Sequence, residues 1–168
     1  MHNNLKKFEI AIGTAQNADS AWSALQDFSK AAVGHRLFTV MTVDMRAGLA
    51  RRSFSDHPME YPVSGTKPIK RDAWFDIVHL ERRSFVANTI ADIALVFPDF
   101  QLIASLGCGS VINLPVIVGN ELVATINLLH EENFYTPERV AAAELNLALP
   151  AMLCCTLAKH FAAASDRG

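Results

Sequence analysis

Cysteine is scarce in this chain of 168 residues, and neither cysteine nor histidine is spaced as in a structural zinc site. The three cysteines, Cys108 and the neighbours Cys154 and Cys155, do not form a disulfide framework. Basic residues are not in excess either: 15 lysines and arginines stand against 17 acidic residues, for a net charge of −2. The chain therefore lacks the basic footprint of a nucleic-acid-binding protein. We expect a reduced, cytoplasmic protein with no metal site and no nucleic-acid partner.

Signals for export and for a membrane span are also missing. The first residues, MHNNLKKFEI, contain no apolar segment followed by small residues, so we expect no secretory signal. The longest apolar run, 140–158, is interrupted by Glu144, Asn146 and Pro150, which argues against a membrane span. The eight glycines and seven prolines do not cluster into a linker. We expect these units: an arm or short helix over 1–17, one domain over 18–163, and a tail over 164–168.

Apolar residues are abundant instead, at 51% of the chain. Thr136 and Pro137 give an N-cap and a first-turn proline, which predict a last helix over 137–163. This helix is apolar on nearly every side, and such helices are usually buried on every side. One side can cover a sheet, and the others need a partner, since such an apolar surplus often signals a subunit interface.

The spacing of apolar residues and the turn signals predict an α+β chain with a largely antiparallel sheet. Asp19 or Ser20 is the expected N-cap of the first strong helix, and Gly34 should end it. Thr89, with Asp92 three residues later, resembles a capping box. The expected elements are a helix over 20–33, strands over 35–44 and 48–55, an irregular loop over 56–68, a short helix over 74–83, a short strand over 84–89, a helix from 90 that is interrupted at 98, a hairpin over 110–130, and the last helix.

The hairpin, SVINLPVIVGNELVATINLLH, contains an asparagine in each apolar strand, Asn113 and Asn127. A strict two-residue turn at Gly119 and Asn120 would place these amides on opposite faces of the sheet. A bulge or an odd-numbered turn instead groups them with Thr125 on one face. The other face is then apolar and suited to helix packing. Its expected members are Ile112, Leu114, Val116, Leu122, Ala124, Ile126 and Leu128.

Buried amides must be hydrogen-bonded, because an unsatisfied one costs roughly 1–3 kcal/mol. Each asparagine could bond the loop above the sheet, or both could face a ligand. The loop over 56–73 and the helix start at Thr89, whose free N–H groups would suit an anion, favour a pocket. The expected ligand-binding residues are Ser110, Asn113, Thr125, Asn127, Asn88, Thr89 and Trp74, and none of them is given a catalytic role.

The C-terminal half resembles a GAF domain, with a serine opening a strand, an apolar-Pro-apolar step, a turn, a second strand and a polar segment before the last helix. The stretches YPVSGTKPI, ERRSFVANT and FPDF resemble the family's loop, short strand and following helix. The resemblance covers about 18–162. It implies a sheet of about six antiparallel strands, N- and C-terminal helices packed on one face, and a loop-covered pocket on the other. It also implies a homodimer joined through the terminal helices.

The resemblance implies a sensory or regulatory domain that binds a small, polar or anionic molecule. The signature of cyclic-nucleotide-binding members is missing from NLLHEENFYTPE, and no cysteine or histidine-rich loop fits a bilin, so we expect no cofactor. One alternative is an interaction module whose pocket is filled by its own side chains. The other is an enzyme like the free methionine-R-sulfoxide reductases. Their acids would fall on Val111, Asn127 and Leu129, and their cysteine near Ala104, so only the nearby Cys108 supports that alternative.

Two further features bear on the pocket. Two pairs of arginines lie beside strands: Arg51 with Arg52, and Arg82 with Arg83. We expect them to lie at the surface. An inward guanidinium would instead anchor an anionic ligand. Trp74 follows the irregular loop and could form a wall of the pocket or fill it.

Overall fold

The computed structural model describes residues 2–165 of the chain. Its centre is one six-stranded sheet with the strand order β3-β2-β1-β6-β5-β4, in which all neighbouring strands are antiparallel. The expected α+β class and strand number are confirmed. The strands are β1 (Leu37–Asp44), β2 (Leu49–Ser55), β3 (Lys67–Pro68), β4 (Phe85–Ala87), β5 (Ser110–Val118) and β6 (Glu121–His130).

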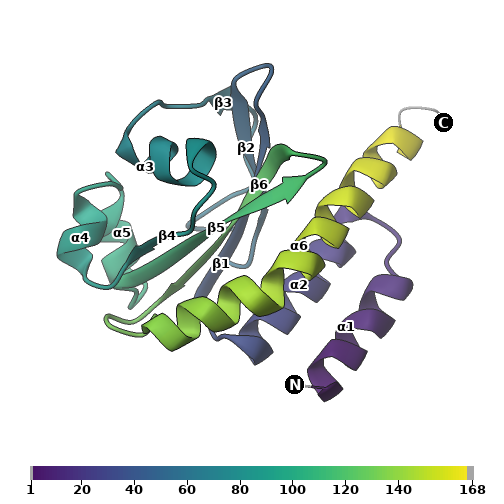
Figure 1. Ribbon diagram of the computed structural model, residues 1–168, viewed down its shortest axis with the longest axis horizontal. Helices are drawn as coiled ribbons and strands as arrows, with labels where there is room; N and C mark the ends of the chain where they lie inside the picture. The colour runs from purple at the N-terminus through teal and green to yellow at the C-terminus, as the bar shows by residue number, and fades with distance from the viewer. Residues whose placement is uncertain (1, 166–168) are drawn as a thin grey trace.

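The helices lie on both faces of this sheet (Figure 1). The terminal helices α1, α2 and α6 pack together on one side, and the short helices cover part of the other side. Residues 2–13 thus form a helix, one of the two forms that the sequence left open, and of the expected tail only residues 164 and 165 are described. The helical elements are α1 (His2–Gly13), α2 (Ala18–Ala32), α3 (Ala73–Phe75), the π-helical turn η1 (Asp76–Leu80), α4 (Ile90–Ala94), α5 (Phe100–Ser105) and α6 (Pro137–Ser165).

The main core lies between the sheet and helices α2 and α6. Trp22, Leu25 and Phe28 of α2 meet the inner face of the sheet, because their spacing of three residues puts them on one side of the helix. The N-cap of α2 is Asn17, whose side chain accepts from the backbone N–H of Ser20, so the expected cap at Asp19 or Ser20 is wrong. Thr89 caps α4 as expected and accepts from the N–H of Asp92.

The hairpin has the register that the hydrophobic pattern favoured. Asn113 pairs directly with Asn127, and a bulge between Val116 and Ile117 compensates for the two-residue turn. The apolar residues of the opposite face enter the core under the helices. One expectation is corrected: Leu122 pairs with Ile117, and Val123 joins the core cluster in its place. The bulge thus puts both amides on the face away from the terminal helices.

Helix α6 has apolar residues both on the side that packs in the core and on a side that is exposed. Ala143, Leu147 and Ala151 are buried, while Leu145 and Leu149 are 80% and 76% exposed. By length and composition α6 could also cross a membrane, although only 28% of that apolar window is buried here. Within the fold, its small residues pack against α2 and the sheet. The exposed leucines leave an unpartnered stripe beside this packed side.

A candidate ligand-binding cavity

A cavity of about 430 Å³ lies on the face of the sheet opposite the terminal helices. This volume is within the range of small-molecule sites in proteins. Its floor is formed by β1, β2, β5 and β6, and its walls by the segment 67–74, η1 and the turn between α4 and α5. Of the residues expected from the sequence, four line it: Trp74, Asn113, Thr125 and Asn127.

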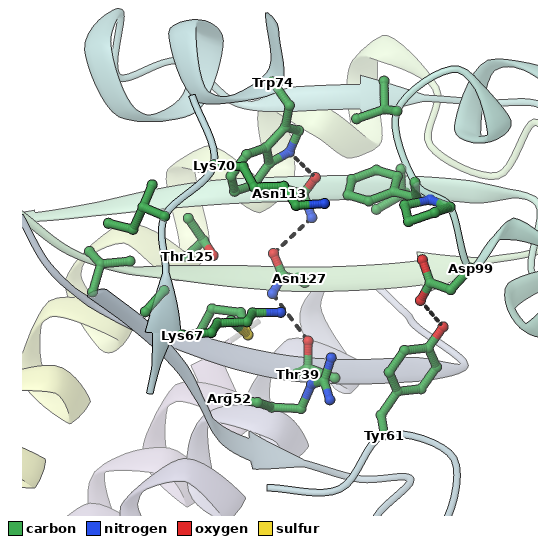
Figure 2. Close-up of a pocket in the computed structure, with 18 of the residues that line it drawn as sticks. Thr39, Arg52, Tyr61, Lys67, Lys70, Trp74, Asp99, Asn113, Thr125 and Asn127 are labelled. Atoms are coloured by element: carbon green, nitrogen blue, oxygen red, sulfur yellow. Dashed lines mark hydrogen bonds between the residues drawn. The ribbon is translucent and has the colours of Figure 1, made fainter. Parts of the chain in front are cut away.

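A row of polar side chains crosses the floor of this cavity (Figure 2). Thr39 of β1, Asn127 of β6 and Asn113 of β5 are direct cross-strand neighbours, so their side chains share one face. Nδ2 of Asn113 donates to Oδ1 of Asn127 at 2.7 Å, and Nδ2 of Asn127 donates to Oγ1 of Thr39 at 3.1 Å. Each amide nitrogen still has a second hydrogen to donate. Hydrogen bonds within the protein therefore hold these side chains in place, and both amides can still donate to a further partner.

The rows on either side differ in chemistry. Toward the α4–α5 side the next row is apolar, with Leu37, Leu129 and Val111 paired across the strands. Toward the other side lies a mixed row in which Met41 separates Arg52 of β2 from Thr125 of β6. A molecule on this floor meets apolar carbon beside the amides, and the Arg52 side chain extends from the mixed row toward Tyr61.

Several buried polar atoms of the cavity residues have no hydrogen-bond partner within residues 2–165. They are Oγ1 of Thr125, Nε of Arg52 and Nδ1 of His79. Thr125 is 1% exposed and His79 is 5% exposed, so bulk water does not solvate them freely. Unpaired buried polar groups are uncommon in folded proteins and cost free energy. A polar ligand that bonds these atoms would remove that cost.

Arg52 contradicts the expected surface placement of the arginines. Its guanidinium carbon lies 4.9 Å from the ring centroid of Tyr61, and Nη1 donates to the carbonyl of Pro62 at 3.1 Å. Burial lowers the pKa of this guanidinium, which remains charged at neutral pH. Arg51, one residue earlier, is exposed. One arginine of the pair thus reaches the cavity, and Arg82 and Arg83 remain at the surface.

Tyr61 and Asp99 join two walls of the cavity. The hydroxyl of Tyr61 donates to Oδ2 of Asp99 at 2.8 Å, which links the loop after β2 to the start of α5. Burial and this carboxylate raise the pKa of Tyr61, so it remains a donor at neutral pH. The bond fixes the loop over the apolar end of the floor (Figure 2).

Trp74 forms a wall of the cavity and does not fill it. Its Nε1–H donates to Oδ1 of Asn113 at 2.9 Å, which places the indole at the end of the asparagine row. Its ring lies 5.2 Å from that of His79 and 6.4 Å from that of Phe97. Desolvation lowers the pKa of His79, so its imidazole is neutral at physiological pH. Three aromatic rings therefore stand beside the amides.

Three expected binding residues lie elsewhere, and each holds a piece of backbone. Ser110 donates to the carbonyl of Glu131 at 2.6 Å and is fully buried. Asn88 bonds both the N–H and the carbonyl of Tyr135. Thr89 caps α4, whose first N–H is already occupied by the carboxylate of Glu132 at 2.8 Å. The helix start expected to bind an anion is thus satisfied within the protein, and none of the three lines the cavity.

The cysteine considered for reductase chemistry is also outside the cavity. Cys108 is 4% exposed, and burial raises the pKa of its thiol to about 11, so the thiolate is scarce at neutral pH. Ala104, where the reductase cysteine would fall, is exposed on α5. Among residues 2–165, no cluster of three or more His, Cys, Asp or Glu could hold a metal ion.

No family model and no curated protein sequence matches the chain. Several solved protein structures, in contrast, are similar to it. The GAF domain of a phosphoenolpyruvate-protein phosphotransferase from Coxiella burnetii is 14% identical, with a TM-score of 0.69, and the match covers 97% of this chain and 95% of that one. The GAF domain of a two-component sensor histidine kinase from Bacillus halodurans is 16% identical, with a TM-score of 0.64, 92% of this chain and 99% of that one covered.

A third similar structure contains a ligand: the phycoerythrobilin-bound GAF domain of a cyanobacterial phytochrome. It is 10% identical, with a TM-score of 0.64, and 94% of each chain is covered. These similarities define the protein as an α+β domain with the GAF fold, as the sequence resemblance implied. At such low identity they define the fold alone.

Proposed function

We propose that this protein is a sensory or regulatory domain that binds a small polar molecule in the cavity above the asparagine row. One observation carries the proposal: three residues that line the cavity, Thr125, Arg52 and His79, each contain a buried polar atom with no hydrogen-bond partner within residues 2–165. A cavity with an apolar lining and a few convergent polar groups is typical of ligand sites. The folds compared above belong to proteins of signalling systems, which supports a regulatory role.

The ligand would act by selecting one arrangement of the segment that covers the cavity. Loop 56–66 is tied to the rest of the wall by the Tyr61–Asp99 bond, and β3 pairs with β2 over only two residues. A ligand that contacts both the floor and this segment would stabilise the closed arrangement by its difference in affinity for the two states. The terminal helices, on the opposite face of the same sheet, would transmit that difference to a partner.

We further propose that the domain acts as a cytoplasmic homodimer joined through its terminal helices. Leu145, Leu149 and Leu153 of α6 are exposed along one side of the helix, at 80%, 76% and 42%. Leu5 and Ile10 of α1 are also more than half exposed. Contiguous exposed apolar side chains of this kind are typical of subunit interfaces. The partner in this proposal is a second copy of the chain.

The ligand-free interaction module remains the second candidate, and one observation favours it. Trp74 and Tyr61 pack on the open face of the sheet and use hydrogen bonds that a ligand could have taken. These contacts fill part of the face. The remaining volume of about 430 Å³ and the three unpaired atoms support the ligand-binding candidate over it.

A thermal-shift screen tests the proposed function. The panel contains amino acids, their sulfoxides, nucleotides, small carboxylates and matched uncharged analogues, each at millimolar concentration. A ligand present at about 100 times its Kd stabilises the fold by about 2.7 kcal/mol, which raises Tm by several degrees in a domain of this size. The shift should shrink in Asn113→Ala and in Asn127→Ala. Asn88→Ala, which removes an asparagine outside the cavity, should keep it.

A Tm shift that both cavity variants retain in full would place the ligand elsewhere. If no compound shifts Tm, the interaction module becomes the better account of the domain.

A further inference from the structure

The polar groups of the cavity are mainly hydrogen-bond donors. Asn113 and Asn127 each keep one free amide hydrogen beyond the bonds within the row, and the Arg52 Nε–H has no partner within residues 2–165. The two carboxylates at the walls already accept bonds from the protein. Asp72 caps α3 through the N–H of Phe75, and Asp99 accepts from Tyr61.

Two lysines increase this excess of donors. Lys67 and Lys70 lie on the segment that covers the cavity, and both line it. Figure 2 shows their side chains extending over the asparagine row, Lys67 toward Asn127 and Lys70 toward Asn113. Neither ammonium group has a hydrogen-bond or ion-pair partner anywhere in the described part of the chain. With Arg52, three cationic side chains thus stand at one cavity beside two acids that are already engaged.

The positions of these groups determine how a ligand would be oriented in the cavity. The two lysines and the amides lie over the polar row of the floor, while Leu37, Leu129 and Val111 form the apolar row beside Phe97 and Ile103. A free inorganic anion would leave that apolar part empty. A purely apolar molecule would leave the amides, Arg52 and Thr125 unpaired, which is costly.

We infer that the ligand of this cavity is a small organic oxyanion. Its carboxylate or phosphate group lies between the asparagine amides and the ammonium groups of Lys67 and Lys70, and its apolar body lies on the Leu37–Leu129–Val111 row. This inference rests on the proposed function, since it names the ligand class for the same cavity. Charge-assisted bonds to an oxyanion are about twice as strong as neutral ones, so the charge contributes a large share of the selectivity.

Binding would also fasten the covering segment to the sheet. Lys67 and Lys70 come from a segment held by two residues of strand pairing and by the bond from the Ile69 N–H to the Gly48 carbonyl, whereas the amides belong to the central strands. An oxyanion bonded to both would join them. Trypsin cleavage after Arg71, an exposed residue next to Lys70, therefore reports closure independently of affinity.

The test uses matched probes that differ in charge and not in shape. Kd is measured by calorimetry for a series of carboxylates from acetate to 3-phenylpropionate, for phenyl phosphate, and for the uncharged 3-phenylpropionamide. We expect an acid with an apolar body to bind at least about tenfold more tightly than its amide. Added salt should weaken binding of the acid and leave binding of the amide unchanged. Comparison of the Kd values of the carboxylate and phosphate probes shows which of the two oxyanion groups the cavity prefers.

The double variant Lys67→Gln/Lys70→Gln should lose at least about tenfold in affinity for the acid and lose its protection from trypsin after Arg71. The control Lys7→Gln/Lys159→Gln removes the same charge from exposed positions on α1 and α6 and should bind the acid as the wild type does. An amide that binds as tightly as its acid, or a lysine variant with unchanged affinity, overturns the oxyanion while leaving a ligand-binding cavity. If neither acids nor uncharged probes bind, the proposed function fails together with this inference.

Discussion

Asn113 and Asn127 face each other directly across β5 and β6, and the amide of the first donates to the carbonyl oxygen of the second at 2.7 Å. The pair lies in the middle of a longer chain of bonds that begins at the indole of Trp74 and ends at the hydroxyl of Thr39. Both amides are nearly fully buried, at 4% and 8% exposure. The chain of bonds explains how two asparagines can occupy the sheet, and their free hydrogens explain how the same residues can bind a ligand.

The bond between the asparagines predicts strong coupling between them. Asn127→Ala removes a partner from both Asn113 and Thr39, so we expect a loss of about 1–3 kcal/mol in the free energy of unfolding. Once one asparagine is gone, removal of the other should cost less, with a coupling energy of about 1 kcal/mol. Urea unfolding of the two single variants and the double variant measures it. Asn146→Ala, which loses only a bond within α6, is the control, and additive effects of the two cavity variants would contradict the coupling.

Removal of the Thr125 hydroxyl should preserve or increase stability, in contrast to the loss expected for the asparagine variants. This hydroxyl is buried with no hydrogen-bond partner in the described part of the chain, and valine has almost the same shape. Thr125→Val should therefore leave the ligand-free protein as stable as the wild type or more stable by up to about 1 kcal/mol, because an unpaired polar atom is removed. The same variant should bind the ligand more weakly. A marked loss of stability in urea would show that the hydroxyl is already satisfied within the protein.

Buried histidines make the stability depend on pH. Burial lowers the pKa of His35, while the bond with the Gln26 carbonyl and the nearby Asp56 raise it by less. Since the folded protein binds this proton less readily than the unfolded chain, stability is fully present above the ordinary histidine pKa of about 6.5 and falls as the pH drops below it. Urea unfolding between about pH 7.5 and pH 5.5 should show this fall.

The variant His35→Gln isolates this contribution from the other titrating groups. Its Nε2 amide can still bond the carbonyl of Gln26, which His35 contacts at 3.2 Å. We expect a shallower fall in stability with acidification than in the wild type. An identical fall in both proteins would mean that His35 is not responsible.

The leucine stripe on α6 predicts the oligomeric state. The wild type should sediment as a dimer, and Leu145→Glu/Leu149→Glu should sediment as a monomer with an unchanged circular dichroism spectrum, since both side chains are exposed in the single chain. Leu95→Glu is the matched control, because Leu95 is 84% exposed at the end of α4, on the other face of the sheet. A wild type that is monomeric at micromolar concentrations would contradict the proposed dimer.

The hairpin shows why part of the site could be predicted from sequence. Strand alternation is a local pattern, so the grouping of Asn113, Thr125 and Asn127 follows once one face has to be apolar. Thr39 completes the polar row but lies 88 residues from Asn127 in the chain, and no local pattern reveals that pairing. Arg52 reaches the cavity because a register shift between Val40 and Met41 decides which arginine of the pair turns inward.

Three residues expected at the site lie outside the cavity for a common reason. Ser110, Asn88 and Thr89 are polar residues beside strand and helix ends, and there the same residue types either hold backbone or bind ligands. Their chemistry is identical in both roles, and only the position of a partner such as the Tyr135 backbone distinguishes them. The lysines of the covering segment were missed for the opposite reason, because exposed lysines are ordinary and only the fold brings these two over the amides.

The most direct test of the cavity is a titration of the ¹⁵N-labelled protein with the best-shifting compound of the screen, followed by the side-chain N–H signals. The Trp74 indole and the amides of Asn113 and Asn127 belong to the cavity, whereas Trp22 lies in the main core and Asn88 bonds the Tyr135 backbone, so both serve as internal controls. A ligand held by the asparagine row should shift the first three signals saturably, with one Kd, and leave the two controls in place. Saturable shifts confined to the controls or to the terminal helices would contradict the account.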